Sequence, residues 1–283
     1  MPYLVVVLKL FRDLPEVISN ELRNNRRFRY SYLDHLKNKI KNGFVVLGSG
    51  PTVNELTEAQ FDNIANKVSI ATGRWIWHDF VPDIYIIESG RSEPMQRWLK
   101  DFSKKLTEKE VEYRNTIIFI DGVKGDQALQ SLIEVSIPDS LKNNLFFTQV
   151  LKPPSGSSVL FAAFLKFLKV IPIHTLLGLT VHCRSSTVLC ALIGYYIGAE
   201  KITLVGVDGY AGYFVDQSIQ GFHGDYGGLD KNYTKPLHST ANPEYGVPTV
   251  TDCCIVISEV CTPCLISSKN ALLSQYLEID DLS

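Results

Sequence analysis

The stretch GFVVLGSGPTVNEL, residues 43–56, carries the pattern that decides the fold. It contains an uninterrupted apolar run from Phe44 to Leu47, then the small-residue turn Gly48-Ser49-Gly50-Pro51, and we expect a helix to begin near Thr52. An apolar run without alternation is typical of a strand that is buried on both faces, as in a parallel sheet covered by helices. The stretch therefore predicts a central strand, a tight turn and a helix.

The same pattern recurs along the chain. Short runs rich in β-branched residues alternate with helical stretches, which is the order of elements in a doubly wound sheet. The runs are KVSIATGRWIW (67–77), DIYIIE (83–88), NTIIFID (115–121), LFFTQVL (145–151) and KITLVGVDGY (201–210), and the helical stretches include PMQRWLKDFSKKL (94–106) and STVLCALIGYYIG (186–198). The sequence predicts an α/β fold with a doubly wound, mostly parallel, Rossmann-like sheet.

Two regions depart from this pattern. Residues 1–42 form an N-terminal extension, in which we expect a strand over 1–13 and then a helix with a basic centre at Arg23, Arg26, Arg27 and Arg29. That centre is either a solvated helix face or a patch for anionic lipid headgroups or an anionic acceptor. Within the main domain, 43–283, residues 209–248 are rich in Gly, Tyr, Asp and His without periodicity, which predicts a lid that is mobile when empty.

Composition and charge argue against several functional classes. Of 283 residues, 45% are hydrophobic, and the formal net charge is −2, whereas proteins that bind nucleic acid are usually strongly basic. The most apolar stretch, 159–181, is interrupted by Lys166, Lys169 and Pro172, so it is not expected to span a membrane. We expect a cytoplasmic protein, with peripheral contact at the inner membrane and homo-oligomerisation as open alternatives.

The six cysteines are interpreted as reduced thiols packed in the core. Cys261 and Cys264 have CxxC spacing and follow Cys253-Cys254, so a zinc or redox site is the alternative. The pairs are too close together in an apolar stretch for the usual structural zinc arrangement, which favours packing. Cys183 and Cys190 belong to the same interpretation.

Several residues at predicted strand ends suit ligand binding. The turn at 48–51 is either a phosphate-binding turn or a plain tight turn, since Val53 breaks the full GxGxxG pattern. Asp208 follows a strand and would bind ribose or sugar hydroxyls, or cap its loop, while Ser185 and Ser186 would cap a helix or touch a ligand. His238, with His223 as its rival, lies in the predicted lid, where a titrating base is expected.

With these pieces in place, the chain resembles the bacterial sialyltransferases of glycosyltransferase family 42. The matching pieces are VVLGSGPTVNEL (45–56), RSSTVLCALIGYYIGAEKITLVGVDGY (184–210), LHSTANPE (237–244) and CTPCLISSKNALLSQYLEI (261–279), the last resembling the family's C-terminal helix. The resemblance implies a single domain similar to the GT-A type, with a lid that closes over CMP-sialic acid. It also implies metal-independent transfer of the sugar to a glycan hydroxyl of lipopolysaccharide or capsule, with the CMP-sugar as co-substrate and no cofactor.

The resemblance also assigns roles to residues. Those placed against the CMP moiety are Gly48, Ser49, Gly50, Pro51, Thr72, Gly73, Arg74, Ser185, Ser186 and Asp208. Tyr210 and, as a looser match, Tyr213 would donate to the phosphate, and His238 would take the proton of the acceptor hydroxyl.

Two departures from the family pattern keep other functions open. Glu88 stands where the family has asparagine, and Thr72-Gly73-Arg74 stands where it has an Asn-Gln pair. A carboxylate near a phosphate is repelled unless Arg74 or Arg91 pairs with it. The donor could therefore be CMP-Kdo, with Asp208 or Glu88 as the carboxylate nucleophile of a retaining enzyme. A nucleotide-dependent oxidoreductase and a non-catalytic binding protein are the further alternatives.

Overall fold

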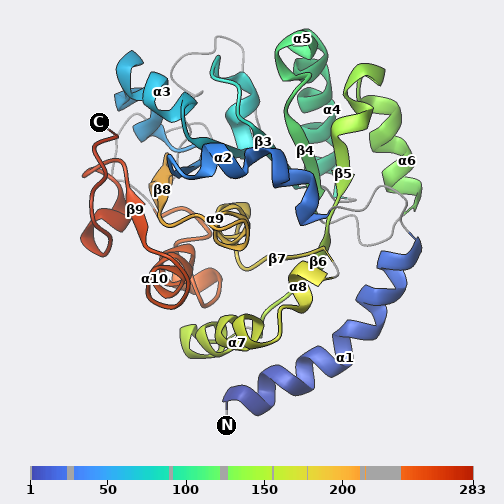
Figure 1. The fold of residues 1–283 in the computed structure, drawn as a ribbon, viewed down its shortest axis with the longest axis vertical. Helices are drawn as coiled ribbons and strands as arrows, with labels where there is room; N and C mark the ends of the chain where they lie inside the picture. The colour runs from blue at the N-terminus through green and yellow to red at the C-terminus, as the bar shows by residue number, and fades with distance from the viewer. Residues whose placement is uncertain are drawn as a thin grey trace.

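The structure is a computed structural model, and it describes residues 2–23, 29–88, 92–121, 127–154, 156–176, 178–210, 214 and 237–282. Its centre is a seven-stranded sheet in the order β5-β4-β3-β2-β1-β8-β9 (Figure 1). All six neighbouring pairs are parallel. The strands are β1 (Phe44–Leu47), β2 (Val68–Thr72), β3 (Ile84–Glu88), β4 (Ile117–Asp121), β5 (Leu145–Phe147), β8 (Ile202–Val205) and β9 (Cys264–Ile266).

Strand order reverses at β1. The chain runs outward from β1 through β2, β3, β4 and β5 on one side, and β8 and β9 lie on the other. Phe44 is therefore paired with Val68 on one side and with Ile202 on the other. Ligands of open parallel sheets bind beyond the carboxyl ends of the strands at such a switch point. The loops after β1 and β8 meet there.

Helices cover both faces of the sheet, which confirms the predicted doubly wound fold. Along β1, Phe44 and Val46 belong to one buried core, and Val45 and Leu47 belong to the other. The first core is shared with α7, α9 and α10, and the second with α3, α4 and α6. The helices are α1 (Pro2–Arg23), α2 (Lys37–Ile40), α3 (Glu58–Ala65), α4 (Glu93–Glu108), α5 (Glu110–Tyr113), α6 (Gln127–Ser136), α7 (Ser158–Val170), α8 (Ile173–Leu176), α9 (Ser186–Tyr196) and α10 (Val250–Val260).

The predicted strand at 1–13 is wrong, because these residues belong to helix α1. Val6 and Leu10, four residues apart, are buried on the side of α1 that packs against α7 (Figure 1). Helical spacing of the core-facing residues thus overrides the strand preference of the valines. The helix expected beyond residue 13 is also interrupted: α1 ends at Arg23, and a 3₁₀ helix over Tyr30–Leu36 leads into α2. Residues 24–28, with Arg26 and Arg27, lie outside the described residues.

Two further predicted helices are corrected. After the turn at 48–51 the chain forms a 3₁₀ helix, Pro51–Glu55, and α3 begins only at Glu58, where Thr57 and Gln60 make a capping box. The C-terminal piece, 261–279, contains β9 and a short 3₁₀ helix, Leu272–Gln275, in place of the helix that the family resemblance implies. The predicted helices at 94–106 and 186–198 are confirmed as α4 and α9.

The C-terminal residues cover the outer edge of β9. The N–H of Ile266 donates to the carbonyl of Glu278 at 2.8 Å, and the N–H of Asp280 donates back to Ile266 at 2.9 Å. The carboxylate of Asp280 also accepts from the Thr203 hydroxyl of β8 at 2.6 Å. A separate two-stranded parallel sheet, β6 (Gln149–Leu151) with β7 (Leu179–Val181), lies beside the main sheet (Figure 1).

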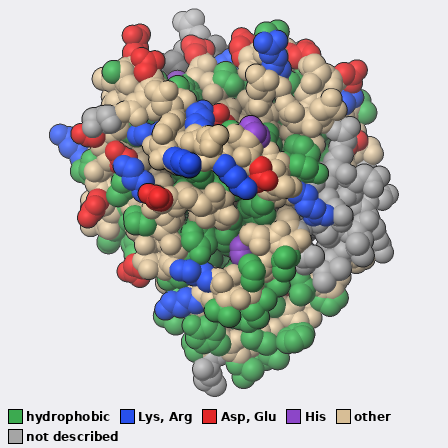
Figure 2. Space-filling view, viewed as in Figure 1, with side chains coloured by type: hydrophobic (Ala, Val, Ile, Leu, Met, Phe, Trp, Pro, Cys, Tyr) green, Lys and Arg blue, Asp and Glu red, His purple; other side chains and the backbone are tan. Residues whose placement is uncertain are grey.

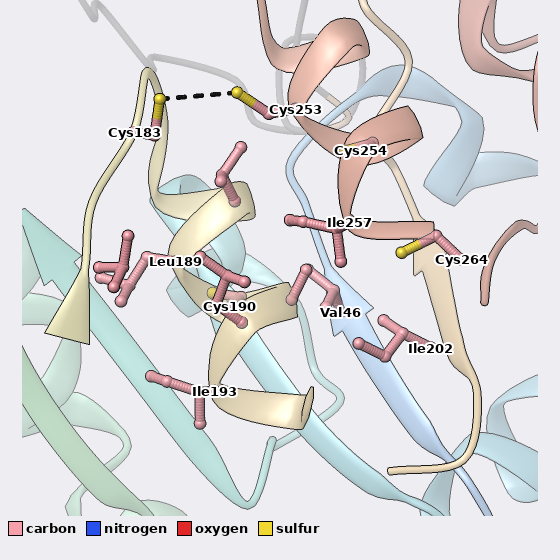
Figure 3. Packing of buried hydrophobic residues seen from close by; sticks show 14 of the residues in the cluster. Val46, Cys183, Leu189, Cys190, Ile193, Ile202, Cys253, Cys254, Ile257 and Cys264 are labelled. Carbon is pink, nitrogen blue, oxygen red and sulfur yellow. Dashed lines mark hydrogen bonds between the residues drawn. The ribbon is translucent and has the colours of Figure 1, made fainter. Parts of the chain in front are cut away.

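The cysteines are packed as thiols, as predicted, and all six are free. Five are buried and Cys261 is half-buried. Figure 3 shows Cys190, Cys254 and Cys264 among aliphatic side chains of α9, α10 and the sheet, while the Cys253 thiol faces Cys183, with the sulfurs 3.6 Å apart. Burial raises the pKa of Cys254 to about 12, which makes this thiol unreactive near neutral pH.

Candidate functional site

A cleft of about 260 Å³ opens at the switch point, between the loops that follow β1 and β8 and the start of α9. Ligand sites of this fold class lie at this position. Eleven predicted site residues line it: Gly48, Ser49, Gly50, Thr72, Gly73, Glu88, Ser185, Ser186, Asp208, Tyr210 and His238. The cleft is also lined by Arg184, Thr187, Gly206, Val207, Gly209, Thr240 and Val250, which were not predicted. Tyr213 and His223 lie outside the described residues, as does most of the predicted lid.

The glycines of the turn at 48–51 serve the packing of two loops. Gly48 N–H donates to the carbonyl of Val205 at 2.7 Å, and Gly50 N–H donates to that of Gly206 at 2.8 Å. A Cβ on Gly48 would lie 2.5 Å from the Gly206 oxygen, so a larger residue would push the loops apart. Both N–H groups are therefore occupied, and Pro51 at the following position has no N–H to offer. Within this turn, the N–H of Ser49 is the one backbone donor without an acceptor among the described residues.

Asp208 also holds together the loops that follow β1 and β8. Its buried carboxylate accepts from the backbone N–H of Thr52 at 2.9 Å and from the Thr52 hydroxyl. A Cβ on Gly50 would lie 2.4 Å from the Asp208 carboxylate, which shows how closely the turn approaches it. Of the two roles considered from sequence, the loop-stabilising one has direct contacts in the structure.

Ser49 joins the turn to the loop after β2. Its hydroxyl donates to the carbonyl of Thr72 at 3.1 Å and accepts from the N–H of Arg74 at 2.7 Å. The Ser49 hydroxyl is thereby committed within the protein. Thr72 differs, because its hydroxyl is buried at the cleft without a hydrogen-bond partner among the described residues.

The turn from Arg184 to Thr187, which leads into α9, carries the unpaired donors of the cleft. Arg184 has a positive φ of 69°, a strained conformation for a residue with a side chain. Its terminal guanidinium nitrogens donate to the carbonyls of Tyr245 at 2.7 Å and Ser239 at 3.0 Å, but its buried Nε has no partner in the described part of the chain. The same holds for the buried hydroxyl of Ser185, the N-cap of α9.

Backbone groups extend this set of donors. Among the described residues, the N–H groups of Ser186 and Thr187 have no hydrogen-bond acceptor, as expected for the first turn of a helix. The helix dipole adds positive potential at the same point, and Arg184 forms no ion pair with any described carboxylate. The start of α9 therefore has the charge and the donors of an anion-binding site.

His238 also lines the cleft, on the described segment at the end of the predicted lid. Its backbone N–H donates to the carbonyl of Gly209 at 3.0 Å, and the neighbouring Leu237 bridges to Tyr210. Its Nδ1 lies 2.9 Å from the Thr240 hydroxyl and accepts a hydrogen bond from the Thr240 backbone N–H at 3.3 Å. Burial lowers the pKa of His238, so the imidazole is neutral near pH 7, which is the state a general base requires.

Glu88 is held by partners other than the predicted arginines. The Ser186 hydroxyl donates to Glu88 Oε1 at 2.5 Å, and His182 Nε2 lies 3.6 Å from the same oxygen. Arg74 instead places its guanidinium 5.4 Å from the centre of the Trp98 ring, and Arg91 lies outside the described residues. Among the described residues, Glu88 is therefore paired with a serine and a histidine, and not with Arg74.

His182 and Asp121 are site residues that were not predicted from the sequence. His182 Nδ1 hydrogen-bonds to the buried carboxylate of Asp121, whose other oxygen lies 3.2 Å from the Thr148 hydroxyl. Burial disfavours the imidazolium, but the hydrogen bond to Asp121 and the charges of Asp121 and Glu88 outweigh it and raise the pKa of His182. The sequence contained one signal for Asp121: like Glu88, it is an acidic residue at the end of an apolar strand.

Two predicted residues lie off the main cleft. Pro51 does not line it, and Arg74 lines a second cavity of about 160 Å³ instead. The two cavities share Thr72, Gly73, Glu88 and Ser186, so they adjoin one another. Within the described residues, no three His, Cys, Asp or Glu side chains are grouped so that they could hold a metal ion.

Comparison of the chain with protein-family models, with curated proteins and with solved structures found no match in any of the three. The class of protein therefore rests on the fold and on the geometry of the site: a Rossmann-like α/β protein with a cleft at the switch point of its sheet. None of the described helices combines the length and apolar character that a membrane crossing requires.

Proposed function

We propose that the protein is a glycosyltransferase that moves an acidic sugar, of the sialic acid or Kdo class, from its CMP donor to a hydroxyl of a cell-surface glycan. The observation that carries this proposal is the set of unpaired donors at the start of α9. Arg184 Nε, the Ser185 hydroxyl and the backbone N–H groups of Ser186 and Thr187 belong to residues that line a cleft at the switch point. A single phosphate between ribose and sugar is an anion of suitable size and charge for them.

These donors also suit the step in which CMP leaves the sugar. When the bond between the sugar and the phosphate breaks, negative charge grows on the CMP oxygen that leaves. Fixed donors aimed at that charge stabilise the transition state more than the ground state. CMP has one phosphate, so Arg184 and the N–H groups supply the charge compensation in this scheme.

His238 is proposed as the base for the acceptor. It lines the same cleft as the start of α9, and its lowered pKa leaves the imidazole able to take a proton near pH 7. The base function requires a lone pair on Nε2, which exists when Nδ1 gives up the hydrogen bond that it accepts from the Thr240 N–H and, as Nδ1–H, donates to the Thr240 hydroxyl. The distance of 2.9 Å is compatible with that hydrogen bond.

The decisive experiment removes the hydroxyl of Ser185. Because this hydroxyl is buried without a partner among the described residues, Ser185→Ala should leave thermal stability unchanged or slightly raised. CMP affinity, measured by calorimetry, should fall roughly tenfold, as expected for one hydrogen bond to a charged group. Ser274→Ala, a change to a serine outside the cleft, is the control and should bind CMP normally.

The donor is then identified with a panel of CMP-N-acetylneuraminate and CMP-Kdo, with released CMP as the readout. Failure of CMP to bind the wild-type protein, or tighter binding of NAD than of CMP, would refute the proposal in favour of another nucleotide enzyme. CMP binding without release from either donor would favour the non-catalytic alternative.

We also propose that the protein works at the cytoplasmic face of the inner membrane. Figure 2 shows hydrophobic side chains gathered at the lower end of the molecule, where α1, α7 and α8 lie. Leu8 and Phe11 of α1 and Val170 and Leu176 beside it are exposed, Phe11 by 78%. The basic stretch at 23–29 comes next in the sequence and suits an anionic lipid surface.

Vesicle sedimentation tests this placement. The wild-type protein should bind vesicles that contain phosphatidylglycerol and should bind pure phosphatidylcholine vesicles weakly. Phe11→Asp should abolish binding, whereas Leu132→Asp, at an exposed leucine on α6, should not. Equal binding of both variants would remove α1 from the proposal.

A further inference from the structure

Glu88 stands between the two cavities of the site. It lines the main cleft, and it also lines the second cavity with Ile87, Met95 and Trp98. An aromatic ring and aliphatic side chains next to a carboxylate form a surface that suits a sugar, which offers an apolar ring face and several hydroxyl donors. Phosphate, in contrast, is repelled by a carboxylate.

One oxygen of the Glu88 carboxylate is available for a ligand. Both neighbours engage Oε1: the Ser186 hydroxyl donates at 2.5 Å, and His182 Nε2 lies at 3.6 Å. Among the described residues, Oε2 has no hydrogen-bond partner. An ionised carboxylate accepts hydrogen bonds at both oxygens, so Oε2 has unused capacity for a hydroxyl.

We propose that the second cavity is a sugar-binding subsite, in which Glu88 Oε2 binds a sugar hydroxyl and the pair Asp121 and His182 holds Glu88 in place. The proposal rests on the proposed function in one respect, because it assigns the sugar end of the cleft whose anion end is the start of α9. Glu88 is thus a ligand-binding residue. Asp121 and His182 act through it and are positioning residues.

The positioning depends on where the imidazole protons sit. Asp121 accepts from Nδ1–H of His182, which leaves Nε2 directed at Glu88. In the imidazolium form Nε2 carries a proton, and its charge attracts the Glu88 carboxylate. On deprotonation Nδ1 keeps its proton because of Asp121, so a lone pair on Nε2 then faces Oε1, and two acceptors repel one another.

The subsite should therefore weaken as the pH rises. The groups that act on His182 are the carboxylates of Asp121 and Glu88, which favour its charged form, and Lys152, which opposes it; the Cys183 thiol lies next to it in the chain. The balance raises the pKa of His182 above the usual histidine value, so the imidazolium is kept to a higher pH than in an ordinary histidine.

The test measures binding of free sugars to the full chain between about pH 6 and pH 9. Kdo, N-acetylneuraminate and galactose are titrated separately and followed by ligand-observed NMR, which separates an acidic donor sugar from a neutral acceptor sugar. Glu88→Gln should weaken binding roughly tenfold, and His182→Gln should weaken binding and abolish its pH dependence. Glu93→Gln, at an exposed carboxylate on α4, is the matched control.

Trp98→Ala provides a second route that leaves the carboxylates untouched, and it should also weaken sugar binding. Wild-type binding by Glu88→Gln, a wild-type pH dependence in His182→Gln, or no binding of any of the three sugars to the wild-type protein would overturn the proposal. Calorimetry with CMP runs in parallel, and the control Glu93→Gln should bind it within about twofold of wild type. Loss of CMP binding by the wild-type protein would count against the proposed function alone.

Discussion

The contact between Asp208 and Thr52 separates two roles for Asp208, namely a clamp between loops and a nucleophile. Both side chains are buried, at 4% and 8% exposure, and the carboxylate accepts from the N–H and the hydroxyl of Thr52. Thr52→Val removes only the hydroxyl donor and keeps the shape of the side chain. Asp208→Asn removes the charge and turns an amide NH₂ toward one of the two donors.

The expected magnitudes follow from these contacts. A hydrogen bond to a charged group is worth about 1.5–3 kcal/mol, so Thr52→Val should lower the free energy of unfolding by roughly 2 kcal/mol. Asp208→Asn weakens both bonds and should lower it by roughly 3 kcal/mol. If the two side chains act on each other, the double variant should be hardly less stable than Asp208→Asn, with a coupling energy of about 1.5–2 kcal/mol.

Urea denaturation followed by tryptophan fluorescence measures all four proteins without any ligand. Additivity of the two single changes within about 0.5 kcal/mol would refute the clamp. In that event the retaining alternative regains support, and intact-protein mass spectrometry after incubation with CMP-Kdo should detect a covalent sugar on Asp208 or Glu88.

Three other predictions are independent of Asp208. His174 is buried against Tyr196, and burial lowers its pKa to about 4. The stability that the neutral imidazole contributes above pH 6.5 should therefore be lost as the pH falls through about 4, and wild type should lose roughly 3 kcal/mol of unfolding free energy over that window relative to His174→Phe. Parallel pH curves of the two proteins in denaturant titrations would contradict this. His238→Ala should lower kcat about a hundredfold with CMP affinity nearly unchanged, and Thr240→Val should lower kcat where Thr240→Ser does not, whereas normal turnover in His238→Ala would move the base to His223. Turnover should survive excess EDTA, and a loss that Mg²⁺ or Mn²⁺ restores would refute metal-independent transfer.

The sheet could be predicted from sequence because its strands are buried on both faces. Runs such as Phe44–Leu47 and Ile117–Asp121 contain no alternation, and at such lengths this pattern is typical of a strand covered on both sides. Helix α1 could not be predicted in the same way. Its valines favour a strand locally, and only the burial of Val6 and Leu10 against α7 makes the helical spacing decisive.

The site was predictable where its residues follow a strand in the chain. Glu88, Asp208 and the turn at 48–51 each end a central strand, so a parallel sheet brings them to one edge. The link between Asp121 and His182 spans 61 residues and joins the end of β4 to the end of β7, a strand of the other sheet. Neighbours of that kind depend on the tertiary arrangement, which no local pattern contains.

The role of the glycines in the turn at 48–51 could not be predicted from the sequence either. A glycine that admits a ligand and a glycine that admits another loop look the same in sequence. Only the approach of Gly206 to Gly48 shows that the second reason applies here. Because the packing of these loops occupies the N–H groups of Gly48 and Gly50, the larger set of unpaired donors lies at the start of α9.

The hydrogen bonds of Ile266 with Glu278 and Asp280 bear on how the protein behaves during production. An uncovered parallel edge strand offers free N–H and C=O groups to a second chain and promotes aggregation. Residues 278–280 occupy those groups on β9, and Asp280 places a charge beside them. A chain shortened at residue 277 would expose this edge while keeping the whole cleft, so insolubility of such a fragment would reflect intermolecular strand pairing. Purification tags placed directly after residue 283 carry the same risk, because they can compete with residues 278–280 for β9.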